Sequence, residues 1–372
     1  MCRLLATLPP LPLLRLPMSP FTKLRLLTLL CLTAPLVCQD PEHDLRVAAK
    51  KGSTVWLLLE EKQEQTIDMG GQQMDVENTT TRTLQIEVKD VDDKGNLVVD
   101  VKIARIHGSM MMPMGMGDIE FDSAKKTEGE EDEDAGGMVF SPAALAKAIT
   151  ALAGKSYGAK VDVYGKVASL EGVADLIKNA NQGPRGMGGG GATTEGQLKQ
   201  YVQSAFGTLP QKPTAQGATW DRVDAEKSTR GGPMQTKLQL TLAKVDADSF
   251  EITATGTVEA APAQKGEEKA EGTGEEADAE NAMREMMKNM KVKNGKVSGT
   301  QRVSRQDGFV IEASNVTSMD IEMPGPMGGE MSMNIKTTLK TKRTTADAAV
   351  PKPDKKDEKK DAPKEAPKEA GK

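Results

Sequence analysis

Hydrophobic and polar residues alternate along much of this chain. Leu84, Ile86 and Val88 alternate with polar neighbours, and residues 97–103 (LVVDVKI) return with the same period. A period of two places the apolar side chains on one face of a strand. Residues 92–96 (DDKGN) separate the two runs, and this composition is typical of a hairpin turn. The pattern predicts neighbouring antiparallel strands that are each buried on one side.

The last such hairpin is rich in methionine. Its apolar positions are Met319, Ile321 and Met323 on one strand and Met331, Met333 and Ile335 on the other. The segment between them, 324–329 (PGPMGG), has the proline and glycine content of a turn. We therefore expect these two runs to pair and to present their apolar side chains on the same face.

The middle of the chain changes to a helical period. Residues 142–153 predict a helix that begins with a proline and stops at Gly154. A second helix is expected from Thr194, because Thr194 and Gln197 have the spacing of a capping box. Its apolar stripe consists of Leu198, Tyr201, Val202, Ala205 and Phe206. These stripes need an apolar face to pack against.

The second half of the chain weakly repeats the first. In each half a strand that begins near a tryptophan, Trp56 or Trp220, precedes a hairpin with the same alternation. The predicted fold is α+β and mainly antiparallel, with two duplicated curved sheets packed on the central helices. Such sheets could form a half-barrel similar to that of periplasmic lipoprotein carriers.

The first residues have the composition of an export signal. Lys23 and Arg25 precede the short apolar run 26–32, and residues 34–38 (APLVC) give way to polar residues. This order is typical of a secretory signal peptide. We assign 1–38 to it, with translation starting at Met18, and expect the protein in the periplasm or outside the cell. The alternative is a lipoprotein, in which an acylated Cys38 would anchor the chain to a membrane.

Composition shifts divide the rest of the chain. The predicted parts are a first β unit (39–180, containing the helix 142–153), a glycine-rich linker with a helix (181–216), a second β unit (217–345) with an acidic insertion (261–280), and a Lys/Pro/Glu/Ala tail (346–372). The insertion and the tail have too few apolar residues to bury, so we predict that both are disordered.

Few reactive side chains follow the predicted leader. All three cysteines (Cys2, Cys31 and Cys38) lie within it, and the chain has only two histidines, His43 and His107. Thiolate metal sites and multi-histidine sites are therefore excluded, and no nucleophile-elbow motif is present. The net charge is −5 and aromatic residues make up 3% of the chain, which disfavours nucleic-acid binding. We expect no catalytic residues, no metal site and no cofactor.

Methionine, with 21 residues, is the main chemical lead. The candidate ligand-binding residues are Met110, Met112, Met114, Met323, Met331 and Met333. Their flexible, polarizable side chains suit an adaptable apolar surface, although ordinary packing in a strand is the simpler interpretation. A third hypothesis is copper(I) binding, since thioethers are soft ligands.

The order of short motifs resembles an uncharacterised family of exported bacterial proteins, a domain of unknown function, over about residues 45–345. The residues that carry the resemblance are Gly52 and Trp56, then Met69-Gly70-Gly71-Gln72, Val88-Lys89-Asp90-Val91, Phe121-Asp122-Ser123, Leu152-Ala153-Gly154-Lys155, 161–167 (VDVYGKV), the strand of Trp220 and Met319-Asp320-Ile321-Glu322-Met323. The resemblance implies export and supplies no catalytic residues.

Together these features favour an exported, non-enzymatic envelope protein that binds a hydrophobic ligand or a partner. The alternative is a structural or scaffolding protein of the cell envelope that has no small-molecule ligand. Contact with a membrane is expected only if Cys38 is lipidated.

Overall fold

The computed structural model describes residues 41–111, 117–125, 142–180, 193–227, 233–260, 290–324 and 330–349. The predicted leader (1–38), the acidic insertion (261–280) and all of the tail beyond residue 349 lie outside these ranges.

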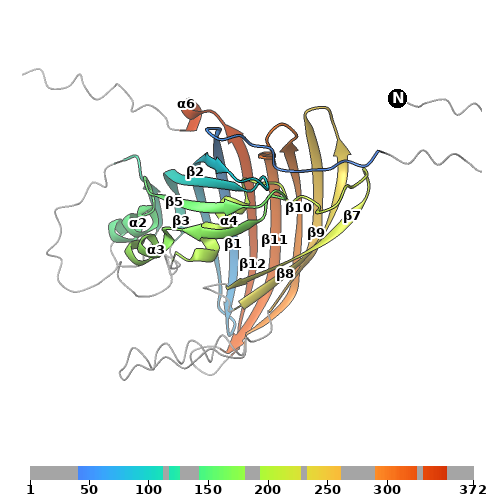
Figure 1. Ribbon diagram of the computed structural model, residues 1–372. Coiled ribbons are helices and arrows are strands. Elements are labelled where there is room, and N and C mark those ends of the chain that lie inside the picture. The colour runs from blue at the N-terminus through green and yellow to red at the C-terminus, as the bar shows by residue number, and fades with distance from the viewer. Residues whose placement is uncertain are drawn as a thin grey trace, which may run out of the picture. The chain divides into compact units, whose positions relative to one another are not determined.

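A single antiparallel sheet of twelve strands dominates the described residues (Figure 1). The strands are β1 (Thr54–Met69), β2 (Gln73–Val91), β3 (Leu97–Met111), β4 (Asp118–Asp122), β5 (Ser156–Val161), β6 (Val167–Glu171), β7 (Thr219–Lys227), β8 (Pro233–Val245), β9 (Ser249–Ala260), β10 (Lys291–Ser304), β11 (Val310–Pro324) and β12 (Glu330–Thr344). Their order is β6-β5-β3-β2-β1-β12-β11-β10-β9-β8-β7, and β4 pairs with β3. The prediction of a mainly antiparallel fold is confirmed.

The first and last long strands meet in the middle of the sheet. β1 pairs with β12 in an unbroken register from Trp56↔Thr344 to Met69↔Met331. The predicted division into two duplicated sheets is therefore not confirmed, because this pairing joins the strands of both halves into one hydrogen-bonded sheet. The strand alternation of each half was readable locally, whereas this long-range pairing was not.

The helices of the described residues are short. They are α2 (Pro142–Thr150), α3 (Val173–Ala180), α4 (Glu195–Gln203) and α6 (Ala346–Ala349). None of them is long and apolar enough to cross a membrane. The N-cap of α4 is Thr194, whose side chain accepts a hydrogen bond from the Gln197 N–H at 3.2 Å, so the predicted capping box is confirmed in its first half.

The helix α2 ends three residues earlier than the predicted 142–153. The N–H of Ala153 donates to the carbonyl of Thr150 at 2.9 Å, a bond that spans three residues rather than four. Such bonds tighten the end of a helix into turns. The chain then reverses at Gly154, whose φ of 78° is the left-handed conformation that glycine adopts without strain.

The core lies on one face of the sheet, which we call the inner face. It carries fully buried side chains such as Leu57, Leu84, Val101 and Ile252. The predicted stripe of α4 packs into the same cluster, and Leu198, Tyr201, Val202, Ala205 and Phe206 are all buried. The helix therefore fills part of the inner face, where its apolar stripe finds the partner that the sequence required.

The segment before β1 crosses one end of the sheet (Figure 1, blue). His43 forms a bridge with Thr214, which lies just before β7. Farther along, the N–H of Val47 donates to the carbonyl of Val163 at 2.8 Å, between β5 and β6. The segment thus links both margins of the sheet at this end, next to the buried core.

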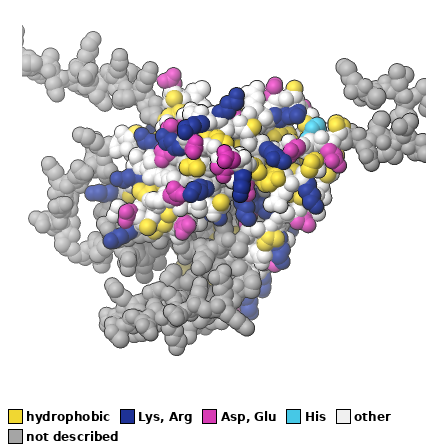
Figure 2. Space-filling model, in the orientation of Figure 1, with side chains coloured by type: hydrophobic (Ala, Val, Ile, Leu, Met, Phe, Trp, Pro, Cys, Tyr) yellow, Lys and Arg dark blue, Asp and Glu magenta, His cyan; other side chains and the backbone are white. Residues whose placement is uncertain are grey.

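The opposite face of the sheet, the outer face, is polar. Lysine and acidic side chains form cross-strand pairs, such as Lys336 with Glu64 at 2.9 Å and Lys293 with Glu322 at 2.6 Å. Figure 2 shows basic and acidic side chains interspersed over the surface. Each exposed pair contributes little stability, roughly 0–1 kcal/mol. The alternation of charge keeps this face in water and directs the apolar positions inward.

Candidate functional site

Apolar side chains continue along the inner face beyond the core, toward the end of the sheet away from the N-terminal segment. We call these residues the methionine face. They are Ile67 and Met69 on β1, Met74 and Val76 on β2, Met319, Ile321 and Met323 on β11, and Met331, Met333 and Ile335 on β12.

Strand register aligns these residues in rows. Met333 pairs with Ile67 on one side and with Ile321 on the other, and Ile67 pairs in turn with Met74. Residues that are directly opposite on neighbouring strands point to the same face. The predicted pairing of the last two strands is confirmed, and the structure sets its register, with Met323 opposite Met331.

The intervening residues point to the outer face, which fixes the orientation of the methionine face independently. The amide of Asn334 donates to Asp320 Oδ1 at 2.6 Å, and Lys336 pairs with Glu64. These polar contacts hold alternate side chains of β1, β11 and β12 outward. Met333 and Ile335 must therefore point inward.

The methionine face differs from the core in its burial. Ile321 is 2% exposed, whereas Met69 is 42% exposed and most of the other members are only half-buried. Among the described residues, none of the methionine face belongs to the core cluster packed around α4. The side-chain amide of Gln65 contacts the sulfur of Met333, which places a polar donor within this apolar surface.

A band of polar side chains, the polar belt, separates the core from the methionine face. It crosses the four central strands at Glu61, Gln63, Asn78, Thr80, Asn315, Thr317 and Thr337. Next to it, Arg82 Nη1 lies 2.7 Å from Glu61 Oε2. The inner face is thus apolar at both ends and polar between them.

Arg82 links the polar belt to α4. Its guanidinium lies over the ring of Tyr201, 4.9 Å from the centroid, which is a cation–π geometry. Burial alone would lower the pKa of Arg82, but Tyr201 and Glu61 raise the pKa above its ordinary value, so the guanidinium stays charged. Burial raises the pKa of the Tyr201 hydroxyl. The pair Arg82–Glu61 is mostly enclosed and holds the belt against the helix.

One polar atom of the belt has no partner in the described part of the chain. The side-chain oxygen of Asn78 is buried and accepts no hydrogen bond. Asn78 pairs in register with Gln63 on β1 and with Met110 on β3. An unsatisfied buried acceptor is unfavourable by about 1–3 kcal/mol, so this oxygen favours a donor brought to the inner face.

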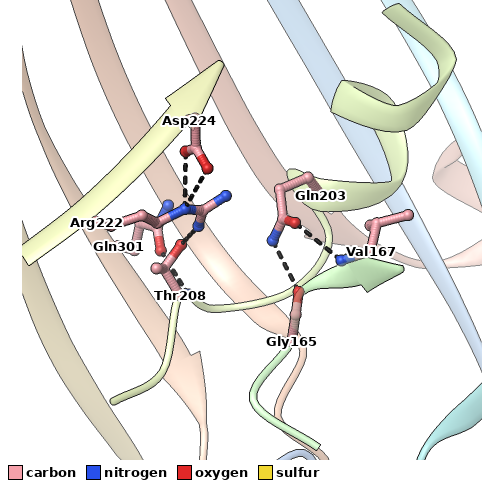
Figure 3. A network of polar contacts seen from close by, with 7 residues as sticks. All are labelled: Gly165, Val167, Gln203, Thr208, Arg222, Asp224 and Gln301. Atoms are coloured by element: carbon pink, nitrogen blue, oxygen red, sulfur yellow. Dashed lines mark hydrogen bonds and ion pairs between the residues drawn. The ribbon is translucent and has the colours of Figure 1, made fainter. Parts of the chain in front are cut away.

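The segment at the end of α4 is tied to one edge of the sheet (Figure 3). The Gln203 amide donates to the carbonyl of Gly165 at 2.8 Å, and its oxygen accepts from the N–H of Val167 at 3.2 Å. Val167 begins the edge strand β6. One side chain therefore satisfies two backbone groups beside an edge strand.

The same segment contacts the strands at the other edge. Arg222 on β7 lies 2.7 Å from Asp224 and also donates to the hydroxyl of Thr208 (Figure 3). The Thr208 N–H lies 3.5 Å from the side-chain oxygen of Gln301 on β10. Gln203 at the end of α4 and Thr208 after it therefore link the helix to β6 and β7, the two edges of the sheet.

The structure groups only part of the predicted ligand-binding set. Met323, Met331 and Met333 lie together on the methionine face. Met110 is on β3, separated from Met331 and Met333 by β2 and β1 and from Met323 by β12 as well, and it packs against the core. Met112 and Met114 lie outside the described residues.

Sequence reasoning missed the members on the first strands. Ile67, Met69, Met74 and Val76 complete the methionine face only because β1 pairs with β12. A local signal existed, since each of them alternates with polar residues, but the pairing across more than 250 residues carried no signal in the sequence. The first hairpin thus supplies half of a surface whose other half is the last hairpin.

The two histidines lie away from this surface. His43 is in the N-terminal segment, and His107 is on the outer-face side of β3. Burial lowers the pKa of His107, and the nearby charge of Arg105 lowers it further. No cluster of three or more His, Cys, Asp or Glu side chains that could hold a metal ion occurs in the described residues.

Comparison with known proteins supports the resemblance to an uncharacterised family. Residues 190–310 match the model of a family of unknown function, DUF6263. The match runs from α4 to the turn before β11, and so covers less than half of the chain. No curated protein matches the sequence significantly.

Among solved structures, one described as "Lipid-protein interactions in lipovitellin" is similar, with a TM-score of 0.41 and 8% identity. The alignment covers 80% of this chain and 26% of the lipovitellin chain. This chain therefore spans about a quarter of that protein. A likeness of this size is a distant similarity of β architecture and carries no argument about function.

Proposed function

We propose that this protein binds an apolar or amphipathic ligand with a long hydrocarbon chain on the methionine face. The observation that supports it is a mainly apolar surface over four neighbouring strands, β2, β1, β12 and β11, most of which stays half-exposed and outside the core cluster. Covering such a surface with hydrocarbon is favourable by about 25 cal/mol per Å².

The side chains present suit a ligand without a fixed shape. Methionine is unbranched and polarizable, so a methionine-lined surface can adapt to chains of different length. The polar belt lies at the inner margin of this surface, where Asn78 offers a buried acceptor that has no partner among the described residues. An amphipathic ligand would place its hydrocarbon on Met333 and Ile335 and its polar group against the belt.

We propose further that the protein acts without catalysis. In the described residues the carboxylate at the belt, Glu61, is paired with Arg82 at 2.7 Å, so it is engaged in an ion pair within the protein. Binding rather than reaction is the function that these residues support.

The fold and the cellular location expected from the sequence fit this proposal. Export by the leader 1–38, followed by cleavage or by acylation of Cys38, would place the protein where it meets lipids. A sheet curved as a half-barrel, in the manner of lipoprotein carriers, would offer its inner face to an acyl chain. A scaffolding role without a small ligand is the alternative, and it requires no accessible apolar surface.

A pair of neighbouring substitutions tests the proposal. Met333 and Ser332 are adjacent on β12 but point to opposite faces. We expect the delipidated full chain to bind a fluorescent fatty acid saturably, and Met333→Gln to weaken binding by at least tenfold. Ser332→Gln, the matched control, should leave the affinity unchanged. Absence of saturable binding, or equal losses in both variants, would contradict the proposal and favour scaffolding.

A further inference from the structure

The outermost row of the methionine face consists entirely of methionines. Met69 on β1 pairs with Met331 on β12, and Met331 pairs with Met323 on β11. The three residues therefore lie side by side on three adjacent strands and on the same face. The sequence separates Met69 from the other two by more than 250 positions, so only the register of the central strands reveals the row.

The spacing of this row suits convergence on one small ion. Side chains directly opposite on antiparallel strands have their Cβ atoms about 5 Å apart. Each methionine side chain has three rotatable bonds and carries a soft sulfur atom near its end. The outer two sulfurs can lean toward Met331, the middle member, so that three thioethers surround a single point above it.

The row is also accessible. Met69 is 42% exposed, and Met323 and Met331 are half-buried. None of them belongs to the core cluster of the described residues. Their sulfurs can therefore reorient without repacking the interior of the protein.

The neighbouring charged groups point away from the row. Asp68 and Glu322, which flank Met69 and Met323, occupy outer-face positions, and Glu322 is held there by Lys293 at 2.6 Å. A hard cation such as Ca²⁺ or Mg²⁺ requires oxygen ligands, which this row does not offer. Thioether sulfur selects soft monovalent ions, of which copper(I) is the biological example.

We propose that Met69, Met323 and Met331 form a three-thioether site for copper(I). The site does not depend on the hydrocarbon ligand proposed above, because it requires sulfur atoms rather than apolar area. Leucine has nearly the volume and apolarity of methionine but no sulfur. Methionine-to-leucine substitutions therefore separate the two proposals.

The test uses the full chain with Cys2, Cys31 and Cys38 each replaced by serine, which removes thiolates that would compete for the ion. Copper(I), kept reduced with ascorbate under nitrogen, is titrated against a colorimetric copper(I) chelator. We expect Met331→Leu to weaken the tightest site at least tenfold. Met319→Leu, two rows away on the same face, is the matched control and should leave the affinity unchanged.

A second measurement identifies the ligating atoms. With 13C-labelled methionine methyl groups, silver(I), a redox-inert soft ion, should shift three methyl resonances together. Each of the variants Met69→Leu, Met323→Leu and Met331→Leu should lack one of these three resonances. The fatty-acid test with Met333→Gln and Ser332→Gln does not use these three variants, so the two proposals can fail separately. Unaltered copper(I) affinity in Met331→Leu, or equal loss in Met319→Leu, would overturn the site while leaving the hydrocarbon proposal intact.

Discussion

The hydroxyl of Tyr157 on β5 donates a hydrogen bond of 2.9 Å to the main-chain carbonyl of Leu198 in α4. Both residues are buried, and they lie 41 positions apart. This bond joins the central helix to the sheet at the margin of the core. It places α4 against the inner face and therefore sets where the filled part of that face ends.

Replacing this tyrosine tests the attachment of the helix. We expect Tyr157→Phe to lower the free energy of unfolding by about 1 kcal/mol, because it removes one buried hydrogen bond and little apolar area. Urea denaturation followed by circular dichroism measures the change. Tyr164→Phe, a partly buried tyrosine next to the same core, is the control and should have a smaller effect. Equal losses would show that the hydrogen bond is not responsible.

The same tyrosine gives the protein a sensitivity to alkali. Burial raises the pKa of Tyr157 above its ordinary value of 10.0, so the fold binds this proton more tightly than the unfolded chain does. The resulting stability is complete below pH 10 and is lost as the pH rises above it. The urea midpoint of the wild type should fall more steeply above pH 10 than that of Tyr157→Phe. Parallel curves would contradict this assignment.

The contact of Gln203 with β6 provides a second prediction. We expect Gln203→Ala to lower the free energy of unfolding by about 1–2 kcal/mol, because the N–H of Val167 and the carbonyl of Gly165 each lose a partner. Gln200→Ala, at an exposed position of the same helix, should change stability by less than about 0.5 kcal/mol. Hydrogen exchange at Val167 should accelerate only in the first variant, and exchange that is unchanged would argue against this role.

The ion pair between Arg105 and Asp122 predicts a loss of stability in acid. It is bidentate, at 3.0 and 2.6 Å, and joins β3 to β4. Arg105 holds the pKa of Asp122 below its ordinary value of 3.8, so the contribution is present above that pH and disappears as the pH falls below it. We expect Asp122→Asn to be less stable by about 2 kcal/mol at pH 7 and equal to the wild type at pH 2. A constant difference at all pH values would contradict this.

His107 lies beside this pair and adds a second step. Its pKa is lowered, so the unfolded chain takes up its proton first and stability falls as the pH drops below about 6.5. Arg105, Asp122 and Glu60 are the charged groups that act on it. His107→Gln should remove the step that begins below about pH 6.5 and leave the step of Asp122, which begins below about pH 3.8. The free energy of unfolding measured from pH 7 to pH 2 distinguishes the step of His107 from that of Asp122.

The pair Glu61–Arg82 in the polar belt gives a fourth prediction. Glu61→Gln leaves Arg82 enclosed against Tyr201 without a counter-charge, so we expect a loss of about 1–3 kcal/mol. Replacing both residues, with Glu61→Leu and Arg82→Leu, should be less harmful than Glu61→Gln alone, since no unpaired charge then remains. Thermal unfolding of the wild type, of Glu61→Gln and of the double variant measures these changes. A double variant that is less stable than Glu61→Gln would refute the reasoning.

The sequence predicted local features well and distant ones poorly. The alternation of Met319–Met323 and of Met331–Ile335 predicted the last hairpin, and the spacing from Thr194 to Gln197 predicted the start of α4. These features depend on neighbours within a few residues. By contrast, the single sheet depends on β1 and β12, whose alternation fits many partners equally well.

The residues of the candidate site also divide into those predicted from local pattern and those placed by long-range pairing. Met323, Met331 and Met333 belong to one hairpin and were found from its pattern, whereas Met69 joins them only through long-range pairing. Met110 shares their residue type and alternation, yet β2 and β1 lie between it and the last hairpin. Methionine content alone therefore identified a chemistry, and the topology decided which sulfur atoms are neighbours.

The placement of β12 beside β1 has a consequence for biosynthesis. β12 is the last strand of the sheet to be synthesised, yet it lies at the centre of the sheet. It pairs with β1, which precedes it by more than 250 residues. Until it emerges from the ribosome, β1 and β11 present long unpaired edges, and contacts of such high sequence separation form slowly. The central sheet of such a chain cannot be completed until its last strand has been synthesised.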